Sequence, residues 1–197
     1  MKTSVVSIIT VLSAIAMADT YKIEPSASHI HWKAGKKVGS FHHGEVKVKS
    51  GTVETDAKGQ LKNANIIADM KTISNQDLKD NPEYQTKLVG HLSSDDFFKV
   101  EKHPEATFEF KSITPKSGTK DEYNVKGNLT MIGSTQPIEF PAKIISEKGT
   151  LVGSAKIIVE RLKWDLKYGS GSIFKSLTAD KIINDTFELT LDLVAKK

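Results

Sequence analysis

Histidines offer the first candidate chemistry in this chain of 197 residues. His29 and His31 are two residues apart, so in a strand both imidazoles would lie on one face, and His42 and His43 follow nearby. Imidazoles gathered in this way can bind zinc. However, no Asp/Glu pair near them completes a tetrahedral set, and adjacent histidines on a strand point to opposite faces. We therefore favour polar histidines at strand ends, and predict no metal.

A second kind of chemistry centres on Arg161, the single arginine of the chain, which stands three residues before Trp164. A guanidinium in this setting can grip a phosphate or quinone head group. It can also stack on the indole and close one end of a barrel. We favour the stacked, structural arrangement, and replacement of Arg161 by Lys and by Met separates the two.

Composition excludes several classes of function. The chain has no cysteine, which removes thiolate nucleophiles and cysteine-ligated metals. Its serines are numerous, but none lies in the Gly-x-Ser-x-Gly turn of a hydrolase. The net charge of +4 comes almost entirely from lysines spread along the sequence, whereas nucleic-acid binders concentrate their basic residues on one face. We therefore expect no catalytic residues, no cofactor and no nucleic-acid partner.

The first residues have the features of an export signal. Met1 and Lys2 form a short basic start, residues 4–16 are apolar and uncharged, and small residues follow at positions 16 and 18. This pattern predicts a signal peptide over residues 1–18, with cleavage after Ala18 and a single domain over residues 19–197. The apolar run is shorter than the roughly 20 residues of a spanning helix. Without cysteine, the exported fold must be stable through its core alone.

Most of the remaining chain alternates apolar and polar residues with a period of two, as half-buried antiparallel strands do. The clearest case is Phe187, Leu189, Leu191 and Leu193 against intervening polar residues. The predicted strands cover residues 44–55, 64–74, 106–113, 123–132, 137–145, 151–159 and 185–195. About eight antiparallel strands favour a closed barrel, because closure removes exposed edges, and a sandwich is the alternative.

One segment departs from this period and predicts a short helix. Asn81 is a suitable N-cap, Pro82 suits the first helical position, and Gly90 is a suitable C-cap. Tyr84 and Leu88 are four residues apart, so we expect them to pack together on the sheet. The barrel interior would be apolar and without titratable groups. It could be a core filled by its own side chains or a tunnel for an apolar ligand, and composition does not separate the two.

Five segments, in order, resemble the YceI-like family. The central one, HLSSDDFFKVEKHPEATFEF, has His-Leu, a short polar step, Asp-Phe-Phe, His-Pro and Thr-Phe entering a strand. The others are DTYKIEPSASHIHWKA, GNLTMIGSTQPIEFP, VERLKWDLKYG and INDTFELTLDLVAKK. Each is weak alone, but together they span nearly all of residues 19–197. The resemblance implies an all-β fold, an eight-stranded antiparallel lipocalin-like barrel with one short helix, usually in the periplasm.

The resemblance also implies that the barrel binds a long polyisoprenoid or another amphiphilic lipid, and that the protein is not an enzyme. Fatty acids or amides, a stress-related role with a filled barrel, and a histidine-based metal protein remain the alternatives, and a homodimer is possible. We expect at most one of the neighbours Phe97 and Phe98 to face the lumen. Possible head-group contacts are Arg161 and His91. The expected lumen-lining residues are Trp32, Met70, Phe108, Phe110, Leu129, Met131, Phe140 and Phe187.

Overall fold

The computed structural model describes residues 18–197, so the predicted signal peptide lies outside the described residues except for Ala18. Nine strand segments, one α-helix and two short 3-10 helices make up this part of the chain. Their bounds are β1 Asp19–Ile23, η1 Pro25–Ala27, β2 His29–Gly35, β3 Phe41–Thr55, β4 Leu61–Asn75, α1 Pro82–Ser93, β5 Glu105–Pro115, β6 Glu122–Met131, β7 Ser134–Glu147, β8 Thr150–Glu160, η2 Arg161–Trp164 and β9 Thr186–Lys196.

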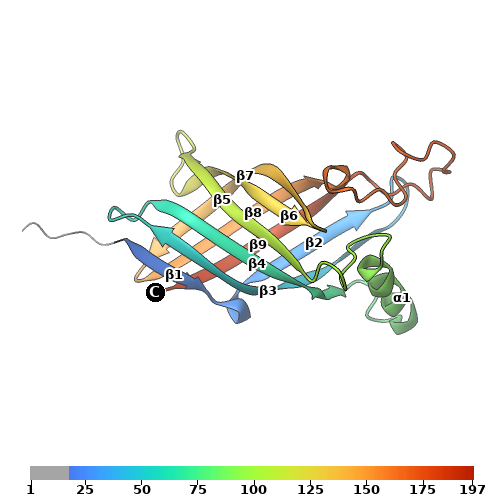
Figure 1. Ribbon diagram of the computed structural model, residues 1–197, viewed down its shortest axis with the longest axis horizontal. Coiled ribbons are helices and arrows are strands. Elements are labelled where there is room, and N and C mark those ends of the chain that lie inside the picture. Colours follow the sequence, from blue (N-terminus) through green and yellow to red (C-terminus); the bar gives the residue numbers. More distant parts are fainter. Residues whose placement is uncertain (1–17) are drawn as a thin grey trace, which may run out of the picture.

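The strands close into an antiparallel barrel (Figure 1). Neighbouring strands follow the order β3-β2-β9-β8-β7-β6-β5-β4, and the pairing of β4 with β3 completes the circle. β1 also lies between β3 and β9, beyond the end of β2, because η1 interrupts the chain between the two segments. β1 and β2 therefore occupy one position in the sheet, which confirms the predicted eight-stranded barrel with a single α-helix.

The two ends of the barrel are built differently (Figure 1). At the hairpin end, short turns join β3 to β4, β5 to β6 and β7 to β8, and β1 begins there. At the helix end lie α1, the turns after β2 and β6, and the long segment of residues 161–185 between β8 and β9.

The helix α1 differs from its prediction in two respects. Asn81 caps it as expected, since its side chain accepts a hydrogen bond from the Tyr84 backbone N–H at 3.4 Å. The helix runs past Gly90 to Ser93, however, so the predicted C-cap was wrong. Tyr84 is 61% exposed and does not pack on the sheet. Val89 and Leu92 pack against the barrel instead, and burial of Leu92 explains why the last turn continues beyond the glycine.

The contact between β7 and β8 is hydrogen-bonded along only part of its length. Pairing runs from the turn at the hairpin end as far as Ala142 and Ala155. The Ile144 N–H points toward the β6 side and donates to the Asp121 carbonyl. Successive backbone nitrogens of a strand point to opposite neighbours, so the nitrogens of the odd-numbered residues of β7, including Pro137 and Pro141, point toward β8. A proline nitrogen carries no hydrogen and cannot join a ladder. The two strands therefore separate toward the helix end, where η2 follows β8 directly.

Candidate ligand-binding cavity

The barrel encloses a cavity of about 250 Å³. Every second residue of β9, from Phe187 to Ala195, contributes to its wall. Those five positions are spread over nine residues, and the eight steps between the first and the last cover about 27 Å along the strand at roughly 3.4 Å per step. A volume of this size spread over such a length makes a narrow channel that runs along most of the barrel.

All of the expected lumen-lining residues lie on the wall of this cavity. Some are buried and others are half-buried. The residues concerned are Trp32, Met70, Phe108, Phe110, Leu129, Met131, Phe140 and Phe187. Alternation along the strands therefore placed these side chains correctly, because successive residues of a strand point to opposite faces of the sheet. Their role in binding a ligand stays a prediction.

Small residues keep the aromatic side chains from filling the channel. At Gly127 a Cβ atom would come within 2.3 Å of the Phe108 ring, so only glycine lets that ring lie against β6. Phe108 also packs on Phe140, with ring centroids 5.6 Å apart. At Gly153, a wall residue on β8, a Cβ atom would meet nothing within 4 Å. The phenylalanines thus lie along the wall, and open space remains beside β8.

Phe97 and Phe98 both contribute to the cavity wall, contrary to the expectation that at most one would. They lie in a turn after α1 and not in a strand, so the rule of opposite faces does not apply to them. Phe97 also contacts His91, with ring centroids 5.0 Å apart. His91 itself is not a wall residue; its Nε2 lies 3.1 Å from an Asp96 carboxylate oxygen on the outside.

The polarity of the wall differs along its length. Besides apolar residues and one glycine, it includes five residues with polar side chains, Thr107, Ser154, Arg161, Asn184 and Thr186. Thr107 on β5 and Ser154 on β8 lie next to inward-facing residues in sequence, so their own side chains point to the outer face of the sheet. The other three lie in and beside the segment between β8 and β9, at the helix end. Arg161 is the one wall residue with an ionisable side chain. Its donors point to protein carbonyls, so the surface that faces the channel is almost entirely apolar even at the helix end.

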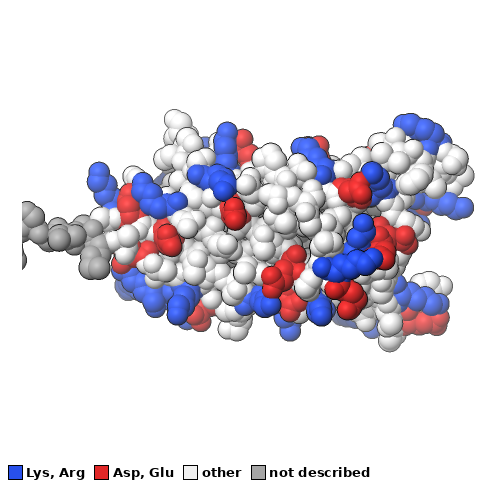
Figure 2. Space-filling view, viewed as in Figure 1, with Lys and Arg blue, Asp and Glu red and all other residues white. Residues whose placement is uncertain are grey.

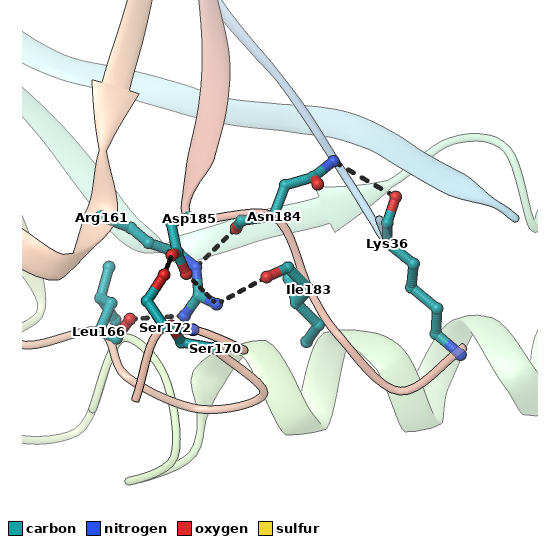
Figure 3. Close-up of polar contacts among 8 residues, drawn as sticks. All are labelled: Lys36, Arg161, Leu166, Ser170, Ser172, Ile183, Asn184 and Asp185. Atoms are coloured by element: carbon teal, nitrogen blue, oxygen red, sulfur yellow. Dashed lines mark hydrogen bonds and ion pairs between the residues drawn. The ribbon is translucent and has the colours of Figure 1, made fainter. Parts of the chain in front are cut away.

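Arg161 is buried and bonded to the segment that it precedes (Figure 3). Its Nε donates to the Asn184 carbonyl at 2.8 Å. One terminal nitrogen donates to the Leu166 carbonyl, and the other donates to the Ile183 carbonyl at 3.1 Å. The second terminal nitrogen also lies 3.5 Å from an Asp185 carboxylate oxygen. The guanidinium therefore joins the two ends of the 161–185 segment.

The predicted stacking of Arg161 on Trp164 was wrong. Among the described residues 18–197, the cation–π contacts do not include one between these two side chains. The Trp164 indole is almost fully buried and donates its Nε1–H to the Leu129 carbonyl at 2.9 Å. It thereby ties η2 to β6. Sequence spacing missed the carbonyl cluster around Arg161, because backbone acceptors leave no signal in residue types.

The positive charge of Arg161 is balanced by the neighbouring carboxylate of Asp185. Burial lowers the pKa of Arg161, and the neighbouring Asp185 opposes that change. For Asp185, burial would raise the pKa, but hydrogen bonds from Ser170 and Ser172 and the charge of Arg161 outweigh it and bring the pKa below its ordinary value. Both groups are therefore held in their charged forms at neutral pH.

The histidines lie outside the cavity. His29 and His31 stack on one face of β2 as expected, with ring centroids 5.7 Å apart. His29 is 2.8 Å from a Glu45 carboxylate oxygen, and His42 is 2.7 Å from one of Asp77. Across residues 18–197, no three or more His, Cys, Asp or Glu side chains are grouped to hold a metal ion. The same residues include no helix that is long and apolar enough to cross a membrane.

Comparison with known proteins identifies the family. The model of the YceI-like domain matches residues 21–195, which is nearly the whole described chain. The chain belongs to the YceI-like family. Among YceI-like relatives, the UPF0312 protein of Pseudomonas putida strain GB-1 is 36% identical over 134 residues, covering 67% of this chain and 65% of that protein. Protein YceI of Escherichia coli O6:H1 strain CFT073 is 31% identical with the same coverage, so the match spans 65% of these relatives' length.

Solved YceI-like structures have the same fold. Burkholderia cenocepacia BcnA superimposes with a TM-score of 0.67 at 21% identity, covering 87% of this chain and 98% of that one. The YCEI protein of Campylobacter jejuni gives a TM-score of 0.54 at 17% identity, with coverage of 100% and 93%. At such identities the likeness establishes the barrel architecture alone. A YceI-like barrel with this cavity is consistent with binding of a hydrophobic ligand.

Proposed function

We propose that this protein binds a long-chain amphiphile of the polyisoprenoid class, with the tail in the channel and the polar head at the helix end. The observation that carries the proposal is the shape and chemistry of the cavity, which is long, narrow and apolar, with three of its five polar wall residues at that end. Burial of apolar surface contributes about 25 cal/mol per Å², so a tail can bind tightly with few polar contacts. An extended chain fits this channel better than a compact ligand.

The predicted signal peptide and the family support an exported, periplasmic carrier. The channel wall does not by itself distinguish a prenyl from an acyl chain, and a fatty acid or fatty amide is therefore the second candidate. Both bury the same kind of apolar surface, and the two chains differ in their methyl branches and double bonds. The possible homodimer stays a prediction. A contact between Arg161 and the head group also stays a prediction, because the hydrogen bonds of the arginine go to protein acceptors.

The identity of the ligand can be read directly. Protein purified from its own cells is analysed by native mass spectrometry, and the bound lipid is then extracted and identified. A retained prenyl chain is the expected result. A bound acyl chain would replace the polyisoprenoid by the second candidate. Protein that carries no lipid and takes up neither kind of chain would overturn the carrier function.

Filling the channel tests the cavity itself. Gly153→Leu places a side chain in open space, so we expect the fold to stay stable, or to gain up to about 1 kcal/mol from removal of a strand glycine. Binding of a prenyl chain should fall at least tenfold. Val152→Leu is the matched control, since Val152 is next in sequence and 42% exposed on the outside. Equal binding by wild type and Gly153→Leu would show that the ligand lies elsewhere.

A further inference from the structure

Exposed apolar side chains gather at one corner of the helix end. Val38 and Phe41 border the turn between β2 and β3, and Ile173 and Phe174 lie in the segment between β8 and β9. These four side chains are between 46% and 59% exposed. Isolated exposed hydrophobics are ordinary, but a group of them beside one another marks an interaction surface.

Two segments that are distant in sequence form this corner together. The Lys37 N–H donates to the Ile182 carbonyl at 2.8 Å, and the Asn184 N–H donates to the Gly35 carbonyl at 2.9 Å. An isolated bridge also joins Lys36 to Ile183. We call residues 33–41 and 171–182 together the lysine tip. Its base adjoins Ile183 and Asn184, which are wall residues of the cavity.

The charge of the lysine tip is strongly one-sided. Its two segments contain five lysines and one aspartate, a net charge of +4 that equals the net charge of the whole chain. None of these five lysines has an ion-pair partner within the described residues. Residues 76–104, which hold α1 at the same end, contain four lysines and six acidic residues instead. Figure 2 shows lysines around the uncharged surface of the segment after β8.

We propose that the lysine tip docks on an anionic membrane surface. Lysines around exposed apolar side chains suit a lipid interface, where the cations meet anionic head groups and the apolar groups enter the boundary with the acyl chains. Lys33 lies over the Phe41 ring, 4.2 Å from its centroid, and this contact keeps charge and apolar surface together. Docking in this orientation brings the helix end of the cavity to the bilayer. Ala34 is the one tip residue on the channel wall, and neither the five lysines nor the four exposed apolar side chains line the channel, so docking does not depend on which ligand the barrel binds.

Vesicle sedimentation tests the docking surface. The full chain is mixed with phosphatidylcholine vesicles, with and without phosphatidylglycerol. We expect binding to the anionic vesicles only, weakening as salt is added. Each lysine removed should weaken it about fivefold, so Lys36→Gln with Lys37→Gln is expected to lose about 25-fold. Ile173→Ser with Phe174→Ser should lose at least about tenfold.

The matched control is Ile158→Ser, because Ile158 is 59% exposed on β8, away from the tip. It should bind anionic vesicles as the wild type does. The proposal is overturned if the wild type ignores anionic vesicles, if it binds neutral ones equally, or if Ile158→Ser loses as much as the tip variants. The first of these results would leave the tip as a surface for a protein partner. Since no lipid ligand is needed in the channel, these results are independent of the proposed carrier function.

Discussion

The two ends of the barrel are closed by different kinds of interaction. At the hairpin end the closure is apolar: Tyr21, Val53, Leu151 and Ala195 are all buried where β1, β3, β8 and β9 meet. At the helix end polar and apolar contacts are combined: Arg161 is bonded to backbone carbonyls, and α1 packs on a buried apolar cluster through side chains that are themselves only half-buried. Apolar packing is dense and resists local opening, whereas a closure of a few directional bonds can open as a unit. We therefore expect the helix end to open more readily than the hairpin end, and the proposed ligand to enter there.

The largest effect is expected at Arg161. Arg161→Met removes the side-chain donors of three buried carbonyls, and it leaves Asp185 without its positive partner, although the Ser172 hydroxyl still donates to that carboxylate. We expect a loss of about 4 kcal/mol in the free energy of unfolding, measured by urea titration. Arg161→Lys keeps the charge but not the planar set of donors, and should lose less. If Arg161→Met keeps its stability and loses only head-group discrimination, the arginine acts on the ligand and not on the closure.

Substitution of one leucine at each end of the barrel compares the stability of the two closures directly. Leu151→Ala at the hairpin end deletes a buried side chain and should cost about 3 kcal/mol. Leu92→Ala in α1 deletes a half-buried side chain that borders the channel, and about 1 kcal/mol is expected. Hydrogen exchange should show global loss of protection for Leu151→Ala and loss confined to α1 and its surroundings for Leu92→Ala. Equal losses would mean that the two ends are equally rigid.

Sequence reasoning was most successful where a repeating pattern decides the structure. The period of two located the strands and the inward faces, including Phe108 and Phe110, because strand geometry fixes side-chain direction. Asn81 was identified as the N-cap, since that position depends on a local hydrogen bond. Where tertiary packing decides, as at Gly90, the local signal gave the wrong helix end. Neither the division of one strand position between β1 and β2 nor the carbonyls around Arg161 can be read from residue types.

The smallest effect concerns Asp77, which follows β4 at the helix end. Burial alone would raise the pKa of its carboxyl group. The His43 backbone N–H at 2.8 Å, the His42 ring at 2.7 Å and the Asn75 amide at 2.6 Å outweigh burial, and the pKa lies below its ordinary value. The folded protein therefore holds fewer protons here than the unfolded chain does. Asp77 contributes its full stability above the ordinary carboxyl pKa of about 4, and that contribution is lost as the pH falls through the folded value.

Asp77→Asn tests whether protonation of this carboxylate at low pH destabilises the helix end. The variant should lose about 1 kcal/mol at neutral pH, because the amide accepts weaker hydrogen bonds than the carboxylate. Its free energy of unfolding should fall less steeply than that of the wild type below about pH 4. Asp80→Asn, an exposed position three residues later, is the control for loss of one negative charge. If both variants follow the wild-type pH profile, the bonds of Asp77 do not hold the helix end closed, and its closure depends on Arg161 and the packing of α1.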